Sequence, residues 1–279
     1  MAITIDDLPI AHSGPNACEP TRLAQLTTLL LEQFAGVPTT VFVIGNNCPA
    51  LPAELRQQTL RRWAGAGAEI GNHTYSHPGL GRVTSDEYHA DILRAEPILK
   101  GVAARPVRYF RSPMLHIGPT LEKKVALEQF LQAHHYQQAP VTIDNSDWLI
   151  SNVLTRATAA GDTAGQERIR GEYIAYMERV TEFFEKRSVE VVGREFPQIL
   201  LIHANALNSQ MGGELLNMFR RRGYSFVTLE TALRDEAYRQ PDGYIGPNGI
   251  SWIHRWGLAK GIPIVWEPDV ADWLQKASR

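Results

Sequence analysis

The stretch AITIDD, residues 2–7, combines the two features that decide the fold: a short apolar run and acidic side chains directly after it. Short runs rich in Val and Ile are typical of buried strands. Runs of this kind occur at residues 2–5, 39–44, 69–71, 107–110, 139–143, 198–202 and 225–228. Longer amphipathic segments separate them, and this alternation predicts repeated strand–helix units that build a parallel sheet.

Apolar residues at helical spacing predict a helix in most of these intervals. The predicted helices cover residues 21–34, 53–66, 85–100, 120–134, about 166–190 and 213–222. Repeated units of this number favour a barrel over an open sheet, and 279 residues suit a single α/β barrel of roughly 250 residues.

The predicted fold is therefore α/β, a distorted (β/α) barrel of about seven parallel strands. A long helical insertion is expected before the sixth strand. We expect residues 1–279 to form a single domain, with a core at about 1–232 and a C-terminal extension at about 233–279.

Charge and hydropathy exclude some classes of partner. The formal net charge of −2 argues against a nucleic-acid partner, because neutralising phosphates requires clustered Lys and Arg. No apolar run approaches the roughly 20 residues that a membrane span needs. The chain opens Met-Ala without a basic segment or cleavage site. We expect a periplasmic or secreted protein if a leader has been removed, and a cytoplasmic one otherwise. The oligomeric state is not indicated.

The two cysteines, Cys18 and Cys48, lie in segments rich in Pro and Asn that we interpret as loops after the first two strands. If the two loops are neighbours, a disulfide can form in an oxidising compartment. Otherwise both remain free thiols, and the sequence leaves both alternatives open.

Polar residues directly follow five of the predicted strands. The clusters are Asp6–Asp7, Asn72–His77, Arg111–Pro113, Asp144–Asp147 and His203–Asn205. In a parallel barrel the carboxyl ends of all strands meet on one face, so we expect these clusters to converge on one pocket.

Such a pocket suits metal-assisted hydrolysis. Two histidines and one carboxylate form a common hydrolytic zinc site with an open position for water. His73 and His77 are four residues apart, so one turn can aim both inward. Of the adjacent carboxylates, one can bind a metal while the other takes a proton from the water. Each motif alone is a weak signal, but their joint occurrence, each after a strand, favours a functional site.

The order of these motifs resembles the polysaccharide deacetylase family, the NodB-homology domain of carbohydrate esterase family 4. HTYSHP is a full match to the family's His-Ser/Thr-x-x-His-Pro motif, and TIDD, RSPM, DNSDW and LIH resemble its other four. The matching segments are residues 4–7, 73–78, 111–114, 144–148 and 201–203.

The resemblance implies one divalent metal ion bound by Asp7, His73 and His77. Zn²⁺ suits this ligand set, and Co²⁺, Ni²⁺ or Mn²⁺ can occupy the same ligands.

The resemblance also implies catalytic roles for four residues. Asp6 would be the general base, with Arg111 holding it ionised. His203 would be the general acid that protonates the leaving amine, and Asp147 would raise the pKa of His203.

Three further residues would contact the substrate. Trp148 and Leu201 would line the pocket for the acetyl methyl group. The backbone N–H of Met114 would stabilise the oxyanion. Met114 stands where the family has Tyr, which removes a hydroxyl group but keeps the backbone donor.

The implied activity is the removal of acetyl groups from N-acetylated amino sugars of a glycan or oligosaccharide. O-acetyl ester cleavage stays open, because the same groups cleave esters. Hydrolysis of cyclic amides or ureides, as in relatives that resemble allantoinases, is disfavoured because those tend to lose part of the metal triad. A catalytically dead glycan-binding module is disfavoured because Asp6 and His203 are both present.

The C-terminal extension holds aromatic residues with two interpretations. Trp252 and Trp256 can form the wall of a sugar subsite or part of the core. His12 and His116 follow the first and fourth strands, where they can rim the site.

Overall fold

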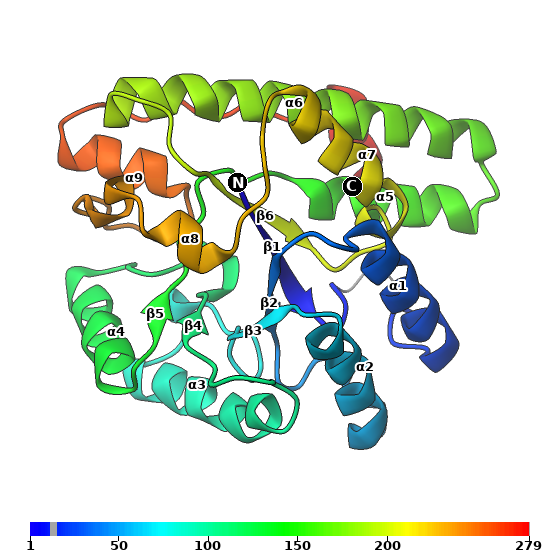
Figure 1. Cartoon of the computed structure of the whole chain (residues 1–279), viewed down its shortest axis with the longest axis horizontal. Helices are drawn as coiled ribbons and strands as arrows, with labels where there is room; N and C mark the ends of the chain where they lie inside the picture. The colour runs from blue at the N-terminus through cyan, green and yellow to red at the C-terminus, as the bar shows by residue number, and fades with distance from the viewer. Residues whose placement is uncertain (12–15, 279) are drawn as a thin grey trace.

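A computed structural model of the chain describes residues 1–11 and 16–278. The centre is a six-stranded sheet in the order β5-β4-β3-β2-β1-β6 (Figure 1), in which every pairing is parallel. The strands are β1 (Ala2–Leu8), β2 (Thr39–Val43), β3 (Glu69–Asn72), β4 (Tyr109–Phe110), β5 (Gln137–Gln138) and β6 (Ile199–His203). The predicted α/β class and parallel strand arrangement are confirmed.

Helices surround the sheet (Figure 1), with α3 packed on β3, α4 on β5, and α1 against α7. The α-helices are α1 (Pro20–Gln33), α2 (Ala53–Gly65), α3 (Ser85–Lys100), α4 (Leu121–Ala133), α5 (Asp147–Ala159), α6 (Thr163–Val192), α7 (Asn208–Arg221), α8 (Leu229–Leu233), α9 (Trp252–Ala259) and α10 (Asp272–Ser278). Short 3₁₀ turns are η1 (Leu80–Arg82), η2 (Pro113–Leu115) and η3 (Glu236–Arg239). Within the described ranges, no helix combines the length and the apolar character needed to cross a bilayer.

The chain after β5 joins the two edges of the sheet. Ala139 N donates to Phe110 O of β4 at 2.7 Å, and a few residues later Ile143 forms a parallel bridge with Leu200 of β6. Residues 137–143 therefore cross from one edge of the sheet to the other and curl it into a distorted barrel.

The structure has six strands where the sequence predicts about seven. The predicted strand 139–143 is the crossing segment, with only Gln137–Gln138 paired as a strand before it. No strand is assigned over residues 225–228 of the described chain. Its backbone bonds to the first residue of the chain: Met1 N donates to Ser225 O, and Val227 N donates to Met1 O. It does not extend along β1, both sides of which are already paired with β2 and β6.

The segment before β6 consists of two packed helices. The long helix predicted at about 166–190 is α6, which begins at an Asp162 side-chain cap and ends at Gly193 with φ 88°. Glycine adopts this left-handed conformation without the steric cost of a Cβ atom. The helix α5, which starts at Asp147, was not expected from the sequence, and it packs along α6.

The C-terminal extension packs back on the barrel. Trp252 N donates to Val141 O at 2.8 Å, and Arg255 Nη2 donates to Leu115 O at 3.0 Å. Trp252 is 7% exposed and Trp256 is 1% exposed, so both belong to the core rather than to a sugar subsite. The single domain and its boundary at about residue 232 stay predictions.

Cys18 and Cys48 form a disulfide between the loops that follow β1 and β2. The alternative of two free thiols therefore does not hold. Cys48 is fully buried, so the bond fixes one loop to the interior beside the carboxyl ends of the strands.

We expect this disulfide to raise the free energy of unfolding by about 3 to 4 kcal/mol, because it closes a loop with a sequence separation of 30 in the unfolded chain. The measurement is denaturant unfolding with and without dithiothreitol. The Cys18→Ala/Cys48→Ala double variant is the control and should not respond to the reductant. Equal midpoints for the wild-type protein in both conditions would contradict the expectation.

Candidate active site

The carboxyl ends of the strands open into a cavity of about 950 Å³. Eight of the predicted site residues line it: Asp6, Asp7, His73, His77, Met114, Trp148, Leu201 and His203. The other two, Arg111 and Asp147, lie directly behind and bond to Asp6 and His203. The structure thus brings all ten predicted residues to one site.

The adjacent carboxylates Asp6 and Asp7 reach the same cavity because β1 is irregular at this point. Successive side chains of a regular strand alternate between its two faces. The register of β1 against β2 shifts between Ile5 and Leu8, and Asp7 has φ 66°. A bulge of this kind redirects a side chain and is common beside active sites. The sequence predicts a pair at the end of the strand, whereas β1 continues to Leu8.

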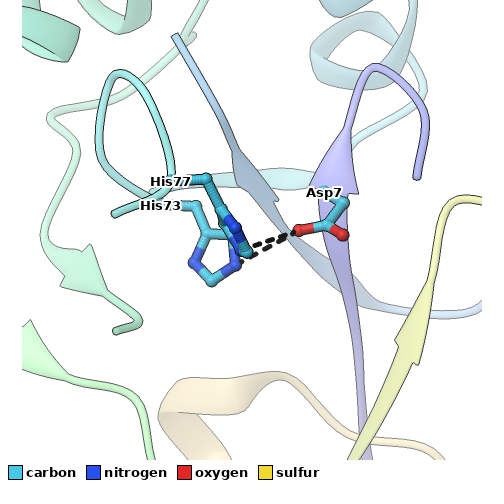
Figure 2. Close-up of side chains that lie close together, drawn as sticks. All are labelled: Asp7, His73 and His77. Carbon is cyan, nitrogen blue, oxygen red and sulfur yellow. Dashed lines mark ion pairs between the residues drawn. The ribbon is translucent and has the colours of Figure 1, made fainter. Parts of the chain in front are cut away.

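Asp7, His73 and His77 gather their donor atoms within 4.8 Å of one another. Asp7 Oδ1 lies 3.4 Å from Nε2 of each histidine, and Figure 2 shows both rings turned toward that oxygen. His77 also has a left-handed backbone, with φ 59°. Such strained conformations cluster at functional sites.

The protonation pattern of this cluster fits a divalent cation. His73 Nδ1 lies 2.8 Å from the carbonyl oxygen of Arg111, so its proton is on Nδ1 and its Nε2 carries a lone pair. Asp7 Oδ1 is buried without a hydrogen-bond partner. Burial and the neighbouring His73 lower the pKa of His77 to about 4, so this ring is neutral at neutral pH. Three lone-pair donors face one another, and a cation between them satisfies all three.

Arg111 holds Asp6 in place. Its buried guanidinium donates from Nη1 to Asp6 Oδ1 at 2.9 Å and to Thr4 Oγ1 at 2.6 Å, and it lies over the Phe42 ring. The other oxygen, Asp6 Oδ2, is 3.9 Å from His73 Nε2. Among the described residues, no hydrogen-bond donor contacts Oδ2, so this oxygen is available to a group in the cavity.

His203 and Asp147 form a second buried pair, with His203 at the end of β6 in register with Asp6 of β1. His203 Nδ1 donates to Asp147 Oδ1 at 2.6 Å, and His203 N donates to Oδ2 at 2.9 Å. Burial alone would lower the pKa of His203, but the charge and hydrogen bond of Asp147 outweigh it and raise the pKa to about 10. The imidazole is therefore protonated at neutral pH, with Nε2–H free of this pair.

Several residues of the site were not predicted from the sequence. Asn205 and Asn208 donate to Asp147 Oδ2 at 2.9 and 2.6 Å and hold the carboxylate ionised. Asn205 lies in the polar run His203–Asn205 that follows a predicted strand, and this run was the one indication in the sequence for either asparagine. The cavity is also lined by residues from α5, α6 and the C-terminal extension: Asn152, Tyr176, Trp266, Glu267 and Asp269. His12 lies outside the described residues, and His116 is not among the described residues that line the cavity.

Residues 1–131 match the sequence model of the polysaccharide deacetylase family. A peptidoglycan-N-acetylglucosamine deacetylase of Bacillus cereus is 30% identical over 148 residues, which cover 53% of this chain and 46% of that protein. A chitooligosaccharide deacetylase of a Bradyrhizobium species is 33% identical over 113 residues, covering 40% and 44%. The chain thus spans less than half the length of these relatives. The resemblance inferred from the five motifs is confirmed.

Solved structures share the fold. A peptidoglycan N-acetylglucosamine deacetylase aligns with a TM-score of 0.52 and 23% identity, covering 83% of this chain and 86% of that one. A carbohydrate esterase family 4 pseudoenzyme from Bacillus anthracis aligns with a TM-score of 0.53 and 17% identity, covering 84% and 65%. At these identities the likeness concerns the barrel and not the activity.

We expect His73→Ala and His77→Ala each to abolish binding of a divalent ion, since each removes one of three converging donors. The affinity should fall by more than the ~100-fold that loss of an outer partner costs. The measurement is calorimetric titration of metal-stripped protein with Zn²⁺. His134→Ala, at an exposed position, is the matched control. Unchanged affinity in either site variant would refute the assigned ligands.

In metal-stripped protein, His203 should titrate near its raised pKa of about 10. This folded-state value exceeds the ordinary 6.5, so the pair stabilises the fold fully below about pH 6.5 and loses that contribution as the pH rises through about 10. Asp147→Asn should lower this pKa, because burial is then opposed only by the more weakly acting charges of Asp7 and Asp6.

The measurement is an NMR titration of the imidazole nitrogens. Asp86→Asn, at an exposed position, is the matched control and should leave the titration unchanged. A pKa near 6.5 in the wild-type protein would show that Asp147 does not hold the proton on His203.

Proposed function

We propose that this chain is a hydrolase that removes acetyl groups from N-acetylated amino sugars of a glycan or oligosaccharide, with a divalent ion held by Asp7, His73 and His77. The observation that carries the proposal is that three groups of residues meet at one cavity. They are the Asp7–His73–His77 cluster, the Asp6–Arg111 pair and the His203–Asp147 pair. The deacetylase family match over residues 1–131 supports it.

The ion, when bound, would lower the pKa of a water molecule and polarise the acetyl carbonyl. We propose Zn²⁺ for this ligand set, with Co²⁺, Ni²⁺ or Mn²⁺ as alternatives. Asp6 then acts as the general base. Arg111 positions its carboxylate through Oδ1, and we assign Oδ2 to accept a proton from the attacking water.

His203 acts as the general acid in the later step, when the C–N bond breaks. Its Nδ1–H is held by Asp147, so the proton on Nε2 is the one that it donates to the leaving nitrogen as the C–N bond breaks. The water supplies the acetate oxygen, and the two proton transfers convert the amide into acetate and a free amine.

Three residues are assigned to the substrate. Trp148 and Leu201 line the cavity beside the reacting groups and receive the acetyl methyl. Met114 has φ 54°, and we assign its backbone N–H to the oxyanion that forms on the carbonyl oxygen.

The protonation of His203 at neutral pH favours cleavage of an amide bond over cleavage of an ester bond. An amine is a poor leaving group unless it is protonated, and the Asp147 carboxylate keeps His203 protonated at neutral pH. An O-acetyl ester remains a second substrate class that the same residues can cleave, with less need for the acid. A dead binding module is disfavoured because the base, the acid and the donor cluster are all present.

We also propose that the protein works in the periplasm or outside the cell. Disulfides persist in oxidising compartments and are rare in the reducing cytoplasm. The Cys18–Cys48 bond supports this location.

The test is acetate release from N-acetylated chitooligosaccharides by metal-loaded protein. Asp6→Asn should retain the metal but lose about 10²- to 10⁴-fold in kcat, because the base is gone. Asp86→Asn makes the same chemical change at an exposed position and should keep the wild-type rate.

Near wild-type turnover by Asp6→Asn would refute the assigned base. Metal binding by the wild-type protein without acetate release from any acetylated sugar would refute the deacetylase and favour the binding module.

A further inference from the structure

Besides Asp7, His73 and His77, the cavity is lined by a wall that the family motifs do not supply. This distal wall consists of Asn152 of α5, Tyr176 of α6 and residues 266–269 between α9 and α10. The C-terminal chain reaches it by running back from α9 behind α6 (Figure 1). At about 950 Å³, the whole cavity lies near the upper end of the ~300–1,000 Å³ typical of small-molecule sites.

Two tryptophans expose large apolar faces inside this cavity. Trp148 is 50% exposed and Trp266 is 60% exposed, whereas Trp63 and Trp256 are each 1% exposed. Exposed aromatic rings in a cavity are typical of binding surfaces. The ring of Trp266 meets the buried His254 ring edge-on, with centroids 5.9 Å apart, so its position is set by the core. A flat indole suits the apolar C–H face of a sugar ring.

The distal wall carries two acidic residues, Glu267 and Asp269, and Asp144 of the DNSDW motif also lines the cavity. No Lys or Arg of the described chain lies within 4.0 Å of these three carboxylates. Asp6, by contrast, has Arg111 as its counter-ion.

A buried histidine holds Glu267 in place. His254 Nε2 lies 3.0 Å from Glu267 Oε2, and His254 Nδ1 is buried with no hydrogen-bond partner among the described residues. Because the ring contacts only Oε2, it orients the Glu267 carboxylate, whose residue lines the cavity.

The neighbouring carboxylates affect each other. Burial, followed by the charge of Glu267, raises the pKa of Asp144 to about 7. A cationic group bound between these two carboxylates would offset the cost of burying the Asp144 charge and the repulsion from Glu267.

We propose that Trp266, Glu267 and Asp269 form a sugar subsite for a glucosamine unit with a free amine, so that the preferred substrates are partly deacetylated chitooligosaccharides. The inference rests on the proposed deacetylase function and specifies its substrate class. Trp266 packs on the sugar ring, and the carboxylates bind the ammonium group. The same charges repel glycans that carry carboxylates, such as those built on muramic acid.

The experiment measures binding, which does not require turnover. Wild-type protein is titrated calorimetrically with a glucosamine tetramer and with the N-acetylated tetramer, in a mildly acidic buffer that keeps the sugar amine protonated. Glu267→Gln and Asp269→Asn retain the shape and remove one charge each. Glu128→Gln removes one charge at an exposed position on α4 that does not line the cavity, and it is the matched control.

We expect Glu267→Gln to weaken binding of the glucosamine tetramer about tenfold, the scale of one charge-assisted hydrogen bond. Binding of the N-acetylated tetramer should change less than about twofold, because a neutral acetamide makes no such bond. Trp266→Ala should weaken both ligands, and Trp266→Phe should recover most of the loss. Thermal unfolding of each variant verifies that it is folded.

The inference is overturned if Glu267→Gln and Asp269→Asn bind the glucosamine tetramer like Glu128→Gln. It is also overturned if the wild-type protein prefers the N-acetylated tetramer. Glu267-dependent binding of the glucosamine tetramer without acetate release from any acetylated sugar would uphold the subsite and refute the proposed function. Acetate release without that dependence would refute the subsite alone.

Discussion

The buried guanidinium of Arg111 bonds both to the barrel backbone and to the site residue Asp6. It is fully buried, and a buried charge costs several kcal/mol unless it is paired and its donors are satisfied. Arg111 donates to Thr4 and Asp6 on β1 and to the carbonyls of Ala139 and Pro140 on the crossing segment. Its own carbonyl fixes the proton of His73. Arg111 thus contacts three strand regions, the proposed base Asp6 and the proposed metal ligand His73.

Two neighbouring buried pairs hold the groups to which the proposed proton transfers are assigned. On β1, Arg111 donates to Asp6 Oδ1, and Asp6 lines the cavity. On β6, in register with Asp6, the Asp147 carboxylate, itself held by two asparagines, keeps His203 charged. The proposed hydrolysis requires such a pair of groups, because one must accept a proton while the other donates one. Both pairs are buried, so solvent screens their charges little.

The proposed catalytic and metal-binding residues come from a different part of the chain than the distal wall. Most of them lie at the ends of barrel strands, whose parallel arrangement brings their carboxyl ends together. The distal wall comes from the paired helices α5 and α6 and from the C-terminal segment, whose helices α9 and α10 pack against them. Changes in these segments can therefore alter what the cavity accepts without moving Asp6 or His203.

The sequence by itself determined the parallel strand–helix order and indicated the candidate site residues, because strand periodicity and motif spacing are local properties. The place of Asp7, His73 and His203 after strands predicted a shared pocket, and the family resemblance implied their roles. Tertiary structure decided what depends on distant neighbours. The segment 225–228 has strand-like residues but lies beside the start of β1, which is already paired on both sides. The bulge at Asp7 lies where the register of β1 against β2 shifts. Whether Trp252 or Trp266 meets the cavity depends on the path of the folded chain, since burial is set by long-range packing that no local pattern encodes.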